Sequence, residues 1–245
     1  MSYRRLGILV FLVCVSCKEP AKQAARPAAA APGMRATVVT IRTTIERDKT
    51  TRDHMLVIAG GRARATNELD MWRLFDTNAN TVTFVDDIEK TIRTEPLAKL
   101  LANRRKANAG ALPAYYPRLT LRRTDESKAV AGANATRHVV ESGAYRRELW
   151  MAEHPAIPRG LFAMMHASEV PSSPLAPMGR ALDEALMTAR GFPLVDRSEV
   201  PYDNGKLVVD RTVVSVAQRE VPETMLQIPK GYKDLTPKPA TPPSP

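Results

Sequence analysis

The segment FPLVDRSEVPYDNGKLVVDRTVVSVAQR, residues 192–219, decides the fold class. Two runs rich in valine and in alternating polar residues flank Asn204-Gly205, a dipeptide that readily adopts the positive φ angles of a two-residue hairpin turn. The pattern therefore predicts two long antiparallel strands, from Phe192 to Val200 and from Lys206 to Arg219.

The same alternation of apolar runs and turn residues continues upstream. Gly60-Gly61, Asn78-Ala79-Asn80 and Ser142-Gly143 each separate two short runs of strand-forming residues. Further strands are predicted at residues 37–46, 54–59, 62–66, 71–76, 81–86, 90–94, 119–124, 137–141 and 147–152. The chain is therefore expected to be mainly β and antiparallel.

A few helices are expected to interrupt the strands. Pro96 suits a first helical position, and Leu97, Leu100 and Leu101 then share one face. Apolar residues recur at helical spacing from Met178 to Arg190, where Gly191 can end the helix. A shorter helix is expected from Leu161 to Ala167. The predicted class is thus α+β.

The first seventeen residues resemble a bacterial lipoprotein signal. Arg4-Arg5 precedes ten apolar residues, Leu6 to Val15, a run too short for a spanning helix of about 20 residues. Ser16-Cys17 follows, and a small residue before cysteine is typical of the lipobox, although Cys14 replaces the usual leucine. The resemblance implies that Cys17 carries a lipid. The alternative is an ordinary cleaved signal.

The rest of the chain divides by composition. Residues 1–16 are the expected signal peptide, and 17–36 the lipidated cysteine with a tether rich in alanine and proline. One folded domain is expected over 37–235, followed by an unpacked proline-rich tail over 236–245.

Composition excludes several function classes. The formal net charge is +10, but basic residues are mixed with acidic ones, aromatic content is 5%, and no nucleic-acid motif is present, so no nucleic-acid partner is expected. The histidines, at positions 54, 138, 154 and 166, lack metal-ligand spacing. No nucleophile elbow or phosphate loop occurs. We therefore expect no catalytic residues, no metal and no cofactor.

The order of the expected elements resembles uncharacterised bacterial envelope lipoproteins related to the carriers LolA and LolB and to the stress sensor RseB. The resemblance is carried by the hairpin 74–86, by the pair 137–140 and 148–152, and by a long hairpin followed by Ile228 to Tyr232. The chain departs from the family at 132–136 and in the long loop 155–177.

The resemblance implies one strongly curved antiparallel sheet, a half-barrel, with helices on its concave side. In the carriers, the space between sheet and helices accepts acyl chains. Candidate residues for such a hydrophobic cavity are Leu161, Phe162, Met164, Met165, Leu182, Ala185 and Leu186. Methionine is flexible and suits surfaces that accept varied apolar ligands. The alternative is that these side chains only pack the core.

The expected function is a non-enzymatic envelope lipoprotein that binds a lipid, an acyl chain or a lipidated protein. Its lipid anchor would hold it in the membrane. Lys18-Glu19-Pro20 has no aspartate at the second mature position, which by resemblance favours the outer membrane, facing the periplasm, over the inner membrane. The alternative is an interaction or stress-sensor module with no small ligand, and an enzyme is the least favoured class.

Overall fold

The computed structural model describes residues 33–66, 70–108, 119, 121–143, 145–169, 186, 190–202 and 205–237. The strands in this part of the chain form one sheet in the order β12-β6-β5-β4-β3-β2-β1-β11-β10-β9-β8-β7. Their bounds are β1 Gly33–Ile45, β2 Thr50–Ala59, β3 Arg62–Thr66, β4 Met71–Asp76, β5 Thr81–Asp86, β6 Thr91–Pro96, β7 Leu121–Val130, β8 Ala133–Ser142, β9 Tyr145–Ala152, β10 Phe192–Tyr202, β11 Gly205–Pro222 and β12 Lys233–Asp234.

The predicted long hairpin forms the middle of the sheet. β10 pairs with β11 from Val195↔Thr212 to Tyr202↔Gly205, and β1 pairs along β11 from Gly33↔Pro222 to Ile45↔Val209. All neighbouring strands are antiparallel except β6 and β12. Because the other strand pairs of the described residues are antiparallel, the predicted mainly antiparallel β class is confirmed.

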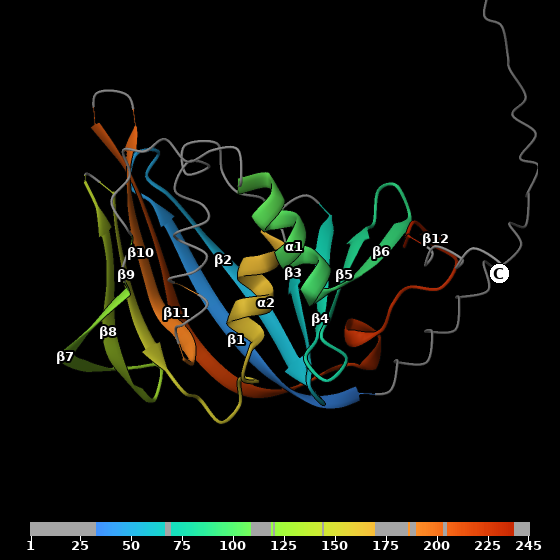
Figure 1. The fold of residues 1–245 in the computed structure, drawn as a ribbon. Coiled ribbons are helices and arrows are strands. Elements are labelled where there is room, and N and C mark those ends of the chain that lie inside the picture. Colours follow the sequence, from blue (N-terminus) through green and yellow to red (C-terminus); the bar gives the residue numbers. More distant parts are fainter. Residues whose placement is uncertain are drawn as a thin grey trace, which may run out of the picture. The chain divides into compact units, whose positions relative to one another are not determined.

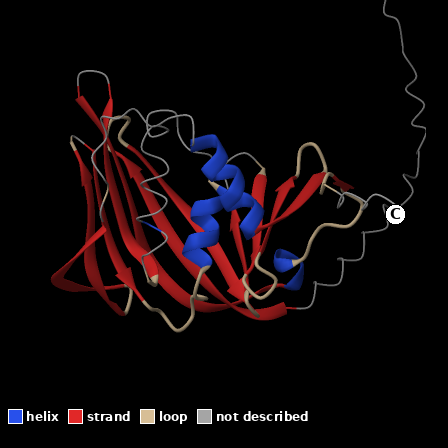
Figure 2. Ribbon diagram, viewed as in Figure 1, coloured by secondary structure: helices blue, strands red, loops and turns tan. Residues whose placement is uncertain are grey.

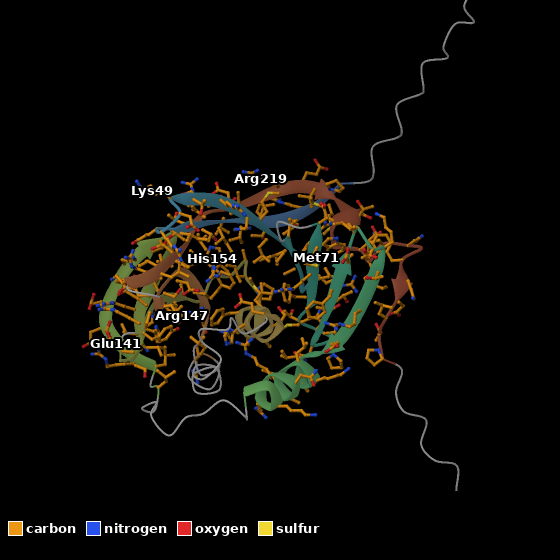
Figure 3. The ribbon with its side chains drawn as sticks, turned by 90° about the horizontal axis from the view of Figure 1, so that it is seen from above. Lys49, Met71, Glu141, Arg147, His154 and Arg219 are labelled. Carbon is orange, nitrogen blue, oxygen red and sulfur yellow. The ribbon has the colours of Figure 1, made fainter. Side chains whose placement is uncertain are left out.

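The sheet is strongly curved, and the helices α1 (Leu97–Asn108) and α2 (Leu161–Ser168) of the described residues lie on its concave side (Figures 2 and 3). Register shifts at Thr40/Ile41 and at Pro193/Val195 mark irregularities in the central strands, where bulges increase local twist and bending. The main core fills the space between these helices and the sheet, and Val39, Phe75 and Leu161 are among its buried members.

The convex side carries a second cover near one edge of the sheet. After β11 the chain forms the 3-10 helix η2 (Glu223–Leu226) and then returns as β12 beside β6 (Figure 1). Leu226 packs there with Trp72, Leu74 and other buried residues of the convex face. Side chains of both faces are therefore buried in this half of the sheet.

Several boundaries differ from the sequence-based expectation. β1 begins at Gly33, inside the predicted tether, because β11 is long enough to pair with it there. The tail is packed at its first residue, since Thr236 Oγ1 accepts a hydrogen bond from the backbone N–H of Thr94 at 2.9 Å. α1 starts at Leu97, since Pro96 still pairs in β6 with Thr81. Of the predicted helix from Met178 to Arg190, only Leu186 and Arg190 are among the described residues.

Candidate functional site

The predicted cavity residues on α2 divide into two groups. Leu161 and Met164 are fully buried in the main core, at 0% and 1% exposure. Phe162 and Met165 are half-buried and face a pocket between α2 and the sheet. Leu186 is buried in a separate cluster with Leu149 and Val200. Leu182, Ala185 and Cys17 lie outside the described residues.

The pocket beneath α2 is small and mixed in character. Its volume is about 60 Å³, and its lining combines apolar with charged side chains: Ile41, Arg147, Phe162, Met165, His166, Glu169, Phe192, Pro193, Asp196 and Arg211. Pockets for small molecules usually measure about 300–1,000 Å³. In this conformation the pocket has room for a few water molecules but not for an acyl chain.

A buried ion pair forms the polar wall of this pocket. Arg147 of β9 donates from Nε to Asp196 Oδ1 at 2.8 Å and from Nη2 to Oδ2 at 2.7 Å, and Figure 3 labels Arg147 within the curve of the sheet. Both side chains are almost inaccessible, at 10% and 8% exposure. Burial alone would raise the pKa of Asp196, but the charge and hydrogen bonds of Arg147 outweigh it and hold that pKa below its ordinary value.

Arg211 of β11 extends the pair into a row across three strands. It lies directly opposite Asp196 in the register, with Nη1 3.5 Å from Asp196 Oδ2. Burial would lower the pKa of Arg147, but Asp196 overcomes this effect and raises it. Arg147 therefore stays charged, and the concave face has a polar row of three side chains beneath α2.

The helix above this row contributes its own polar end. His166 is buried, its ring lies 6.2 Å from that of Phe162, and its Nδ1 is 4.0 Å from Glu169 Oε2. His166 and Glu169 stand at the carboxyl end of α2. The pocket thus has apolar walls at Phe162 and Met165 of α2 and at Ile41, Phe192 and Pro193 of the sheet, beside the charged row.

Side-chain hydrogen bonds fasten the carboxyl end of α2. Arg104 of α1 donates from Nη1 to the carbonyl oxygens of His166, at 3.0 Å, and Glu169, at 2.6 Å. Arg73 of β4 donates to Ser168 Oγ at 3.2 Å. Both helices are therefore tied to each other and to the sheet at one end of α2.

Sequence reasoning missed these charged residues. Arg147 alternates along β9 with Tyr145, Leu149 and Met151, all buried, and this two-residue period was the signal that could have placed it inside.

Among the residues that the structure describes, no group of three or more histidine, cysteine or acidic side chains could hold a metal ion. None of the helices in this part of the chain has the length and hydrophobicity that a membrane-spanning helix requires.

Comparisons with known proteins find distant structural similarities. No family model matches the chain, and no curated protein matches it. Solved structures of PNGF-II in two crystal forms align with TM-scores of 0.45 and 0.43, at 12% and 13% identity. Each alignment covers 83% of this chain, which spans 31% and 32% of the length of the two PNGF-II chains.

A LolA superfamily protein from Nitrosomonas europaea also aligns. Its TM-score is 0.26 at 9% identity, over 81% of this chain and 91% of that chain. At these scores and identities, the comparisons assign neither a family nor an activity to the chain.

Proposed function

We propose that this chain is a non-enzymatic, lipid-anchored envelope protein that takes up an acyl chain, of a lipid or of a lipidated protein, beneath α2. The observation that carries the proposal is the position of Phe162 and Met165. They are half-buried apolar side chains that line a pocket on the concave face of a half-barrel-like sheet. We further propose, from the resemblance of the first residues to a lipoprotein signal, that Cys17 anchors the protein in the outer membrane.

Uptake of an acyl chain requires α2 to move away from the sheet. α2 has eight residues, and helices this short are not stable by themselves in water, so contacts with neighbours hold it. Its amino end follows Gly160, which adopts a left-handed conformation and provides no side-chain cap. Its carboxyl end is held by Arg73 and Arg104. Movement at the amino end would widen the pocket at Phe162 while these bonds remain.

Burial of methylenes would supply the affinity. Each buried CH₂ contributes about 0.8 kcal/mol, so several methylenes of an acyl chain against Phe162, Met165 and Phe192 would offset the cost of displacing the helix. The charged wall formed by Arg147, Asp196 and Arg211 would direct the apolar part of the ligand toward the apolar part of the lining, on α2 and at Phe192.

The test is photocrosslinking of the full chain, held in maltoside micelles, with a palmitate that carries a diazirine group. We expect crosslinks on α2 and on the strands that face it. Met165→Trp fills the pocket and should therefore reduce these crosslinks about tenfold. The variant should still fold, because overpacking by this change costs only about 1–3 kcal/mol. Met55→Trp is the matched control, because Met55 is 48% exposed and belongs to β2.

Phe162→Ala guards against a folding artefact, because it enlarges the pocket and should keep or increase crosslinking. Crosslinks that spread over the whole surface, and that neither variant alters, would contradict the proposal. A protein that folds normally and shows no crosslinks at α2 would instead support the interaction or sensor module. The small volume of the pocket is the observation in favour of that second candidate.

A further inference from the structure

A second group of charged residues lies on the concave face, on the other side of α2. Arg73 of β4, Phe84 of β5 and Arg93 of β6 occupy one row of the sheet, since Arg73 pairs with Phe84 and Phe84 with Arg93. The guanidinium carbons of Arg73 and Arg93 lie 5.7 Å and 4.9 Å from the centroid of the Phe84 ring. Two cations from flanking strands therefore converge over one aromatic ring.

The charges in this row are unequally matched. Arg73 is half-buried, its hydrogen-bond partner Ser168 is a neutral hydroxyl, and no carboxylate of the described residues lies within ion-pair distance of it. Arg93 shares the buried carboxylate of Glu95 with Lys99, at 3.4 Å and 3.8 Å. Glu95 is thus the carboxylate within ion-pair distance of Arg93 and Lys99. Burial lowers the pKa of Arg73, although Glu169 acts on Arg73 from a greater distance.

A pocket is open over the same row. Its volume is about 260 Å³, and its lining includes Arg73, Phe84, Arg93 and the exposed side chains of Met71 and Leu235. Figure 3 labels Met71 at the inner side of the sheet. Asp86 also lines the pocket, but its Oδ1 accepts the backbone N–H groups of Ile88 and Glu89, both at 2.9 Å, which engages that oxygen in the turn.

We infer that this pocket binds a phosphate group, with Arg73 and Arg93 as its donors and Phe84 as its floor, and that the phosphate belongs to a lipid headgroup. Guanidinium groups match phosphate oxygens with pairs of N–H donors. Met71 and Leu235, 39% and 47% exposed, would contact the glycerol and the first methylenes. The assignment of the phosphate to a lipid rests on the proposed function, whereas the anion site itself stands on the geometry of the row.

The site is tested by calorimetric titration of the full chain in maltoside micelles. The titrants are inorganic phosphate, dihexanoyl phosphatidic acid and dihexanoylglycerol, which lacks the phosphate. We expect saturable binding of the phosphatidic acid, weakened about tenfold by Arg93→Gln, because a charge-assisted pair of hydrogen bonds is lost. Arg42→Gln is the matched control, since Arg42 and Arg93 are both 50% exposed and each has a carboxylate partner.

The titrants also separate the two sources of phosphate. Tighter binding of phosphatidic acid than of inorganic phosphate supports the lipid headgroup. Equal and Arg93-dependent affinities would overturn the lipid assignment and leave a site for free phosphate. No binding of either, or equal losses in Arg93→Gln and Arg42→Gln, would overturn the site. Arg73→Gln provides a second variant, and its melting curve shows whether any loss of binding reflects unfolding.

These outcomes are distinct from those of the crosslinking experiment. Phosphate binding that depends on Arg93, without palmitate crosslinks beneath α2, would contradict the proposed acyl-chain function but leave the anion site intact. Crosslinks beneath α2 without phosphate binding would overturn the anion site alone.

Discussion

Arg147 and Asp196 form a bidentate ion pair, with two hydrogen bonds between β9 and β10 in the interior of the protein. Removal of one partner leaves an unmatched buried charge. Arg147→Met and Asp196→Leu should therefore each lower the free energy of unfolding by about 3–5 kcal/mol. The double variant should lose much less than the sum, because neither member of the buried pair is then left without the other, and only Arg211, whose side chain is 43% exposed, loses a neighbouring carboxylate. Urea unfolding of the full chain measures all three, and additive losses would show that the two side chains act independently.

The same pair predicts loss of stability in acid. The pKa of Asp196 is below its ordinary value in the folded state, so the unfolded chain binds a proton first as pH falls. The stabilisation is complete above the unfolded pKa of about 3.9 and is lost as pH falls through the lower folded pKa. The urea midpoint should therefore drop below about pH 4 in the wild type.

The variant Arg147→Met/Asp196→Leu provides the control for this pH dependence. Asp76 and Glu148 also have lowered pKa values and should retain part of the acid sensitivity. The remaining difference between the two proteins isolates Asp196. Identical acid profiles in the wild type and the double variant would exclude the pair as its source.

Local turn chemistry explains why the hairpins were predictable. Gly60 and Gly61 both have positive φ and join β2 to β3, and Asn80, also at positive φ, stands just before β5. Such signals are local and need no tertiary information. The turn at Ala131-Gly132 was missed, because a single glycine after alanine is a weaker signal, and β7 therefore extends further than predicted.

The buried charges and the convex cover were not predictable in the same way. Arg147 and Asp196 are 49 residues apart, and only the register of β9 against β10 brings them together. The return of the chain to β6 as β12 is a parallel pairing without a hairpin signal. On α2, the sequence predicted one group of apolar cavity residues. It could not separate the buried Leu161 and Met164 from the pocket-lining Phe162 and Met165, because that division depends on the helix orientation.

Arg104 should control the attachment of α2. Arg104→Lys removes a planar donor group that bonds two carbonyl oxygens at the end of the helix, and lysine cannot reproduce that geometry. Backbone amides of α2 should then exchange with deuterium about tenfold faster, as expected for a net loss of about 1.5 kcal/mol. Arg105→Lys, at an exposed position of the same helix, is the control. Equal exchange in both variants would contradict this role.

Cys17 is predicted to carry the lipid anchor. Cys17→Ser should abolish incorporation of an alkyne fatty acid and release the protein from membranes, because a serine hydroxyl does not receive the diacylglycerol. Cys14→Ser is the matched control and should retain both. Labelling that persists in Cys17→Ser would exclude Cys17, and loss of labelling in Cys14→Ser alone would move the anchor.

The chain after β11 should be required for stability up to Pro237 and not beyond. Asp87 accepts hydrogen bonds from Trp72 Nε1 at 3.1 Å and from Tyr232 Oη at 2.8 Å, which fastens this segment over the convex cluster. A chain that ends at Pro237 should melt at the wild-type temperature, since the remaining residues are rich in proline and cannot bury enough apolar surface to offset their ordering.

A chain that ends at Pro222 removes Leu226, which is 4% exposed, and uncovers Trp72 and Leu74. Loss of the Leu226 side chain alone should cost about 2–5 kcal/mol, and an uncovered apolar patch promotes aggregation. Calorimetry and light scattering distinguish the two truncations. If the chain that ends at Pro222 stayed soluble and melted at the wild-type temperature, the convex face would be stable without its cover. The segment from η2 to β12 would then contribute to something other than folding.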